Sequence, residues 1–113
     1  MIIPNKQHIL QGKSRKAYFF TVCTPDHDFS STPCIYIYTN LTKNGLGHDY
    51  FEDVYCGETD NMQERASCHS SKQDITSKYT HICICPVSSK EEAKFGQDDL
   101  LASHNFPLNK QRN

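Results

Sequence analysis

Three short runs in the first half of the chain combine aromatic with β-branched residues. They span residues 16–23, 34–39 and 50–57, and polar or turn-forming residues bound each of them, as is typical of β-strands. Residues 40–49 contain two glycines and predict a loop. Residues 1–14 show no periodicity and predict an irregular lead-in. The pattern therefore predicts three strands, the third antiparallel to the second.

Alternation within the second run separates two sets of side chains. Period-two geometry places Cys34, Tyr36 and Tyr38 on one face of the strand, and Ile35 and Ile37 on the other. The expected third strand also carries a tyrosine. We therefore expect tyrosines on two neighbouring strands.

Helical patterns appear in the second half of the chain. A first helix is expected to begin near Thr59 or Asp60, where the residues fit an N-cap and its capping-box partner. A strand is expected over residues 81–86, and Ser88 or Ser89 fits the N-cap of a second helix. The order β-β-β-α-β-α predicts an α+β fold: a small, mixed, mainly antiparallel β-sheet flanked by helices.

Length and composition favour one domain. The 113 residues leave room for one modest core, which we place in residues 15–113, after the lead-in. No apolar run approaches the length of a membrane span, and the N-terminus lacks a signal-peptide profile. All six cysteines fall in strand-like or helical runs, where a cysteine behaves as a small hydrophobe. These features predict a reduced protein in the cytoplasm.

Charge is spread unevenly along the chain. The net charge is −1, so composition alone does not favour nucleic-acid binding. Six acidic residues and no Lys or Arg lie between Asp49 and Glu64, so a polyanion must bind elsewhere. Candidate basic patches are residues 13–16, Lys72, Lys78 and the C-terminal tail, although solvated surface charge explains each of them singly.

One stretch of the chain matches the requirements of phosphodiester hydrolysis. That reaction needs a positioned water, a cation against the charge that grows on the phosphate, and a metal ion held by a carboxylate. Tyr36 and Tyr55 lie on the two neighbouring strands. Arg65 and His69 are four residues apart and share one helix face, and Lys72 follows. Packing or solvation explains each residue alone. Harder to obtain by chance is the ordered set Tyr36, Tyr55, Arg65, His69, Gln97 and Asn109.

Two triplets in the strands carry a resemblance to a known family. Residues 34–36 read Cys-Ile-Tyr and residues 55–57 read Tyr-Cys-Gly, in the places of a Gly-Ile-Tyr and a Tyr-Ile-Gly triplet. Residues 96–101 read Gly-Gln-Asp-Asp-Leu-Leu, like the closing helix of that family, and a Pro-x-Asn ending follows. Over roughly residues 18–109, the chain resembles the GIY-YIG nuclease superfamily, most closely its compact bacterial single-domain members.

The resemblance implies a metal-dependent endonuclease that hydrolyses DNA phosphodiester bonds with one Mg²⁺ or Mn²⁺ ion per site, as a monomer or a dimer. It implies that Tyr36 is the general base and that Tyr55 orients the water or the phosphate. Arg65 would steady the phosphate, and His69 would assist proton transfer. The implied catalytic set is Tyr36, Tyr55, Arg65, His69, Gln97 and Asn109, and the implied substrate-binding set is Arg65, Lys72 and Asn109.

Gln97 departs from the family at the position of its metal-binding glutamate. A neutral amide is a poor ligand for a hard divalent cation, so we expect weak metal binding and an inactive or impaired chain. The isosteric change favours an engineered variant made to trap a complex; the alternative is a natural, metal-poor protein. Two other functions fit the same scaffold: a non-catalytic nucleic-acid-binding protein, and a module that uses its acidic residues 49–64 to bind a protein partner.

Overall fold

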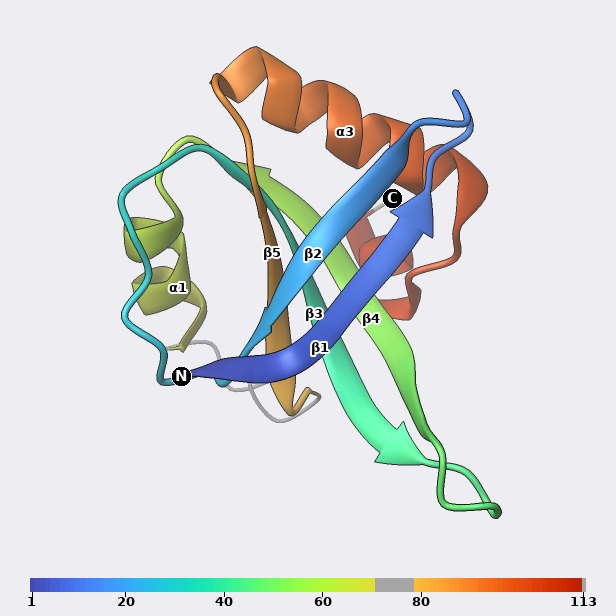
Figure 1. The fold of residues 1–113 in the computed structure, drawn as a ribbon. Coiled ribbons are helices and arrows are strands. Elements are labelled where there is room, and N and C mark those ends of the chain that lie inside the picture. Colours follow the sequence, from blue (N-terminus) through green and yellow to red (C-terminus); the bar gives the residue numbers. More distant parts are fainter. Residues whose placement is uncertain (71–78, 113) are drawn as a thin grey trace.

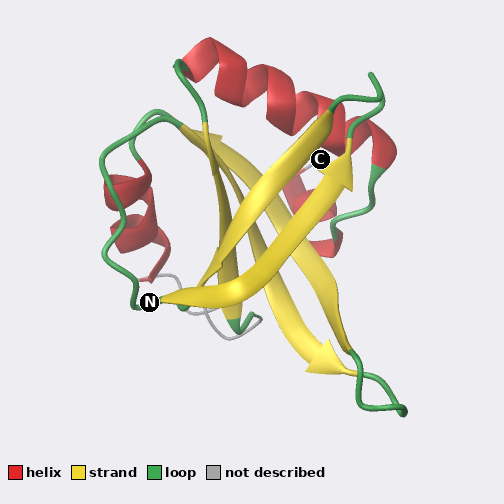
Figure 2. Cartoon of the chain, viewed as in Figure 1, coloured by secondary structure: helices red, strands yellow, loops and turns green. Residues whose placement is uncertain are grey.

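The described chain forms one antiparallel sheet with a helix on each face. The computed structural model describes residues 1–70 and 79–112, without the side chains of residues 5, 67–70 and 110–112. The elements are β1 (Ile2–Gln11), β2 (Ala17–Cys23), β3 (Cys34–Lys43), β4 (Asp49–Thr59), α1 (Met62–Ser70), β5 (His81–Pro86), α3 (Lys90–Ser103) and the 3-10 helix η1 (Pro107–Arg112) (Figure 1). The strand order is β1-β2-β5-β3-β4, and Figure 2 shows the strands (yellow) flanked by the helices (red). The expected α+β class, with a mainly antiparallel sheet and flanking helices, is confirmed.

The prediction that residues 1–14 form an irregular lead-in is wrong. Residues 2–11 form β1, which lies at the edge of the sheet and pairs antiparallel with β2, so a strand precedes the expected order. The pairing shifts register between Ile2 and Gln7, around Pro4. An edge strand tolerates a proline because half of its backbone groups have no ladder partner. The sequence shows little alternation here because polar Lys6 and His8 take inward positions beside Asp49 and Asp53, while Ile9 is exposed.

Half of the predicted loop at residues 40–49 is strand. The ladder between β3 and β4 continues as far as the pair Lys43 and Asp49. The turn is tight because the Asn44 side-chain oxygen accepts hydrogen bonds from the backbone N–H groups of Leu46 and His48, at 2.8 and 3.1 Å. Gly47 supplies the positive φ of 83° that the turn requires.

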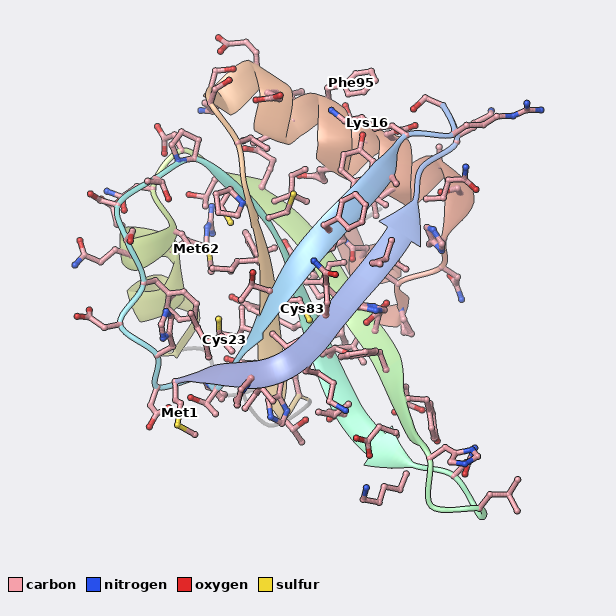
Figure 3. All side chains as sticks on the ribbon, viewed as in Figure 1. Met1, Lys16, Cys23, Met62, Cys83 and Phe95 are labelled. Atoms are coloured by element: carbon pink, nitrogen blue, oxygen red, sulfur yellow. The ribbon has the colours of Figure 1, made fainter. Side chains whose placement is uncertain are left out.

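The central strand β3 separates two apolar cores. Residues 34–39 are all buried, each with at most 1% of its surface exposed. Ile35 and Ile37 pack under α3, together with Phe20 and Leu100. The cysteine and tyrosines of the alternate positions pack under α1, whose anchor is the buried Met62. Figure 3 shows Met62 between α1 and the strands. The predicted alternation of the two faces is thus confirmed.

Side chains also join β1 to β4, the two edge strands of the sheet. His8 on β1 stacks on Phe51 of β4, with ring centroids 4.0 Å apart, and its Nε2 lies 2.8 Å from the Asp53 carboxylate. Nearby, the Lys6 ammonium donates to the Asp49 carboxylate. These contacts draw the edges together, so that β1 passes across β4 in Figure 1. The sheet is therefore curled around the core under α3.

A buried carboxylate fastens the β1–β2 turn (residues 12–16) to α3. Asp99 accepts hydrogen bonds from the Ser14 backbone N–H at 2.8 Å, the Ser14 hydroxyl at 2.6 Å and the Tyr18 hydroxyl at 2.9 Å. These bonds, chiefly those from Ser14, hold the pKa of Asp99 below its usual value. A side chain at Gly12 would collide with this carboxylate, which explains the glycine.

Five of the cysteines lie in described strands as free thiols: Cys23, Cys34, Cys56, Cys83 and Cys85. Most of them are buried, and burial raises the pKa of Cys34 to about 12. They therefore act as small apolar residues of the two cores. Within the described ranges, the helices lack the length and apolar character needed to cross a membrane.

Replacing His8 by alanine should destabilise the fold, because Asp53 would be left largely buried without its partner. The expected loss is about 1–3 kcal/mol of unfolding free energy, measured by urea denaturation. The matched control is His48→Ala, which removes an exposed histidine from the β3–β4 turn and should change little. Equal stability of the two variants would mean that the junction between β1 and β4 contributes nothing.

Candidate active site

The first residue of the site, Tyr36, lies on β3 against a glycine of the neighbouring strand. Tyr36 and Gly57 are register partners in the β3–β4 ladder. A Cβ atom added at Gly57 would collide with the outer ring carbons and hydroxyl of Tyr36. Glycine therefore lets the phenol ring lie directly over the backbone of β4. This contact gives the second triplet a physical reason for ending in glycine.

Four tyrosines gather around this position and form the tyrosine cluster: Tyr36, Tyr38, Tyr55 and Tyr79. The ring centroids of Tyr36 and Tyr55 are 6.1 Å apart, and those of Tyr38 and Tyr55 are 5.7 Å apart. Tyr79 stacks on Tyr38 at 4.4 Å, nearly parallel. Tyr36 and Tyr55 thus share one face of the sheet, on two adjacent strands.

An irregularity in β4 turns Asp53 away from that face. Tyr38 pairs with Tyr55 but Thr39 pairs with Asp53, so Val54 is an extra residue in the ladder. Val54 and Tyr55 both join the core under α1, whereas Asp53 turns to the other face and meets His8. Without the extra residue, alternation would send Tyr55 and Asp53 to the same face. The bulge therefore separates the tyrosine cluster from the junction between β1 and β4.

Helix α1 brings a cation to the cluster. The helix begins where the Asn61 side-chain oxygen accepts a hydrogen bond from the Glu64 backbone N–H at 3.1 Å. Its half-buried Arg65 lies near enough to Tyr36 and Tyr38 for the guanidinium charge to lower their phenol pKa values in part. Burial has the larger effect and leaves both pKa values well above the usual range, and for Tyr36 the neighbouring Tyr55 adds to the rise. Tyr36 is therefore a neutral phenol at physiological pH.

Asn109 holds the edge strand of the site from outside the sheet. Its side-chain oxygen accepts from the Cys56 backbone N–H at 2.8 Å, and its side-chain nitrogen donates to the Cys56 carbonyl at 2.9 Å. Through these two bonds the Asn109 amide pairs with the β4 backbone at Cys56, as a neighbouring strand would. Cys56 lies between Tyr55 and Gly57. The amide is thus committed to the backbone, which gives Asn109 a positioning role in the site.

The remaining predicted residues lie elsewhere or outside the description. His69 belongs to α1, but its side chain is outside the described residues, as is Lys72 entirely. Gln97 is half-buried on α3, which packs on the opposite face of the sheet from the tyrosine cluster. The neighbouring Asp99 turns toward β1 and β2, so helical phase directs Gln97 toward β4. Its convergence with the tyrosines stays a prediction.

The described residues near Gln97 fit a divalent metal ion poorly. Asp98 lies 3.8 Å from Lys94, and Asp99 is committed to the β1–β2 turn. Glu58, the residue after Gly57 on β4, points to the α3 face. Its Oε1 is buried without a hydrogen-bond partner among the described residues. One carboxylate on β4 and a neutral amide on α3 would make a weak site for a hard cation. In the part of the chain that the structure describes, no three His, Cys, Asp or Glu side chains form a metal-binding group.

Two members of the tyrosine cluster were not identified as site residues from the sequence. Tyr38 shares the face of Tyr36 by simple alternation, so a stricter use of that pattern would have included it. Tyr79 precedes β5 in a polar connection whose sequence gives no sign of the contact. Only the pairing of β5 with β3 brings it against Tyr38.

Comparisons with protein-family models, with curated proteins and with solved structures found no match to this chain.

Adding a methyl group at Gly57 should displace Tyr36 from the site. We expect Gly57→Ala to cost about 1–3 kcal/mol of unfolding free energy, because the strand and ring must move apart. Gly45→Ala is the matched control, since an added Cβ there meets no atom within 4 Å. Thermal melts and near-ultraviolet circular dichroism would measure both effects. Unchanged tyrosine dichroism in Gly57→Ala would contradict the close packing.

Alkaline pH should unfold the protein cooperatively. The raised pKa values of Tyr36, Tyr38 and Cys34 favour their neutral forms in the fold. Their stabilising contribution is complete below the unfolded values, about 8.5 for Cys and about 10 for Tyr, and is lost as the pH rises toward the folded values. Urea denaturation between about pH 8 and about pH 11 should show a steady loss of stability. Full ionisation of all tyrosines in a still-folded chain, read from phenolate absorbance, would contradict their burial.

Proposed function

We propose that this protein is a GIY-YIG-type endonuclease scaffold whose substrate is DNA, with its phosphodiester chemistry centred on the tyrosine cluster. The observation that carries the proposal is the placement of Tyr36 and Tyr55 on one sheet face, with ring centroids 6.1 Å apart, beside Arg65 of the next helix. Gly57 and Asn109, which position these strands, match the same family pattern. The buried thiols support a reducing compartment, and we place the protein in the cytoplasm.

In this proposal the cluster orients water rather than acting as a strong base. A neutral Tyr36 phenol would hold the attacking water by a hydrogen bond, and Tyr55 would fix the water or a phosphate oxygen. The water oxygen bonds to phosphorus as the phosphorus–oxygen bond to the leaving sugar breaks. His69 would take the proton of the water, and Arg65 would meet the negative charge that grows on the phosphate.

Metal binding is expected to be weak in the proposed enzyme. The resemblance implies Mg²⁺ or Mn²⁺ held at residue 97, on the helix that covers the opposite sheet face from the tyrosine cluster. Gln97 offers a neutral amide instead of a carboxylate, so we propose that the chain as it stands is inactive or impaired. The same residue favours a second function, a nucleic-acid-binding protein that does not cleave.

A nicking assay on supercoiled DNA separates the two functions. We expect Gln97→Glu to gain cleavage in Mg²⁺ or Mn²⁺, and Arg65→Ala in that background to lose roughly 10²–10³-fold in rate, since the cation acts on charge that develops in the transition state. Thermal melts should show the same fold in each variant and a metal-induced rise for Gln97→Glu alone. Absence of cleavage in every variant, with DNA binding retained, would replace the enzyme by the non-catalytic binder.

A further inference from the structure

The β1–β2 hairpin carries positive charge without any acid of its own. Residues 1–25 contain four Lys or Arg and no Asp or Glu, in contrast with the acidic residues 49–64. Three of these cations, Lys13, Arg15 and Lys16, lie exposed in the β1–β2 turn. None of the three forms a salt bridge with a described residue. The turn is therefore a cationic surface that is free to meet an anion.

The turn is held in one shape before any ligand arrives. Asp99 binds the Ser14 backbone and hydroxyl, and the Gly12 N–H donates to the Lys16 carbonyl at 2.9 Å. Arg15 has a φ of 75°, a left-handed conformation that costs energy for a side chain other than glycine. The structure thus keeps an arginine where a glycine would fit the backbone better. A rigid turn loses little entropy when it binds a ligand.

An exposed aromatic ring shares a groove with one of these cations, Lys16. Phe19 on β2 is 54% exposed, and it shares the sheet face of Thr21, whose partner is Ile84. The pairing of β2 with β5 stops at Thr21 and Ile84, so the strands separate beyond that pair. A groove of about 550 Å³ opens there, bounded by Lys16 and Phe19. Lys16 stands at the start of β2 in Figure 3.

The groove also has apolar and acidic walls. Pro86 and Val87, at the end of β5, form its far side, together with Glu92 of α3. The Glu92 carboxylate accepts from the Ser88 backbone N–H and hydroxyl, both at 2.8 Å; these bonds, with a smaller effect of Lys16, hold its pKa below the usual value, so it stays ionised. A flat, largely apolar ring beside one cation, with two more cations in the adjoining turn, is a combination that binds a nucleic-acid strand through stacked bases and phosphates.

We propose that a single-stranded segment of DNA binds along this hairpin, with its phosphates on Lys13, Arg15 and Lys16 and an unpaired base stacked on Phe19. The inference rests on the proposed function in taking DNA as the ligand, and it adds a second contact region outside the tyrosine cluster. Phe19 lies on the same sheet face as Tyr36, because Ile84 pairs with both Thr21 and Tyr36. A strand bound at the hairpin could therefore continue along this face toward the tyrosines.

Arg15→Gly tests the phosphate contact without harming the fold. Glycine accepts the positive φ freely, so its melting temperature should equal or exceed that of the parent. Its affinity for a fluorescent single-stranded oligonucleotide, measured by anisotropy in EDTA at about 0.1 M salt, should fall about five- to tenfold. Removing all three cations should reduce the salt slope of binding by about 2. Lys43→Gln, which removes a cation from the distant β3–β4 end, is the control (Figure 1).

Phe19→Ala tests the stacked base. It should weaken binding of the single strand by roughly fivefold or more and leave binding of the matching duplex unchanged. Tyr50→Ala, which removes another exposed aromatic ring from β4, should change neither. Hairpin variants that bind like the parent would overturn this inference even if Gln97→Glu cleaves DNA, and so would a parent chain that binds no DNA. Hairpin-dependent binding without cleavage in any variant would retain this site and reject only the nuclease.

Discussion

The need to cover both faces of β3 governs the architecture. Six consecutive residues of this strand are buried, so each face must have its own layer of apolar side chains. Alternating side chains send isoleucines to one layer and tyrosines to the other. Helix α3 covers the isoleucines and α1 covers the tyrosines. The candidate site is therefore part of a core and not a loop added to a finished fold.

Burial also sets the chemical character of the site. The phenols of Tyr36 and Tyr38 are neutral because water is largely excluded from their surroundings, even with Arg65 close by. The same exclusion would strengthen any interaction between Arg65 and a phosphate that enters. A site of this kind can orient a water molecule and stabilise growing charge, but it needs another group to remove the proton. In our proposal that group is His69.

The two ends of the molecule differ in charge for structural reasons. Two acidic residues of β4 join the sheet edges: Asp49 pairs with Lys6, and Asp53 pairs with His8. At the other end, the Asp99 carboxylate accepts hydrogen bonds from Ser14 of the β1–β2 turn. The cations of that turn have no salt-bridge partners among the described residues. A polyanion is therefore directed toward the hairpin and away from the β3–β4 end.

The sequence by itself determined the strands β2 to β5, the two main helices and the division of β3 into two faces, because period-two and helical patterns follow directly from local geometry. It also placed Tyr36, Tyr55 and Arg65 on neighbouring elements. Only the tertiary structure decided that residues 2–11 are a strand, since an edge strand is stabilised by its partner β2 and not by its own pattern. Only the tertiary structure, likewise, turned Asp53 toward His8 and away from the tyrosines, because a one-residue bulge in β4 reverses alternation and pairing across strands is not encoded locally.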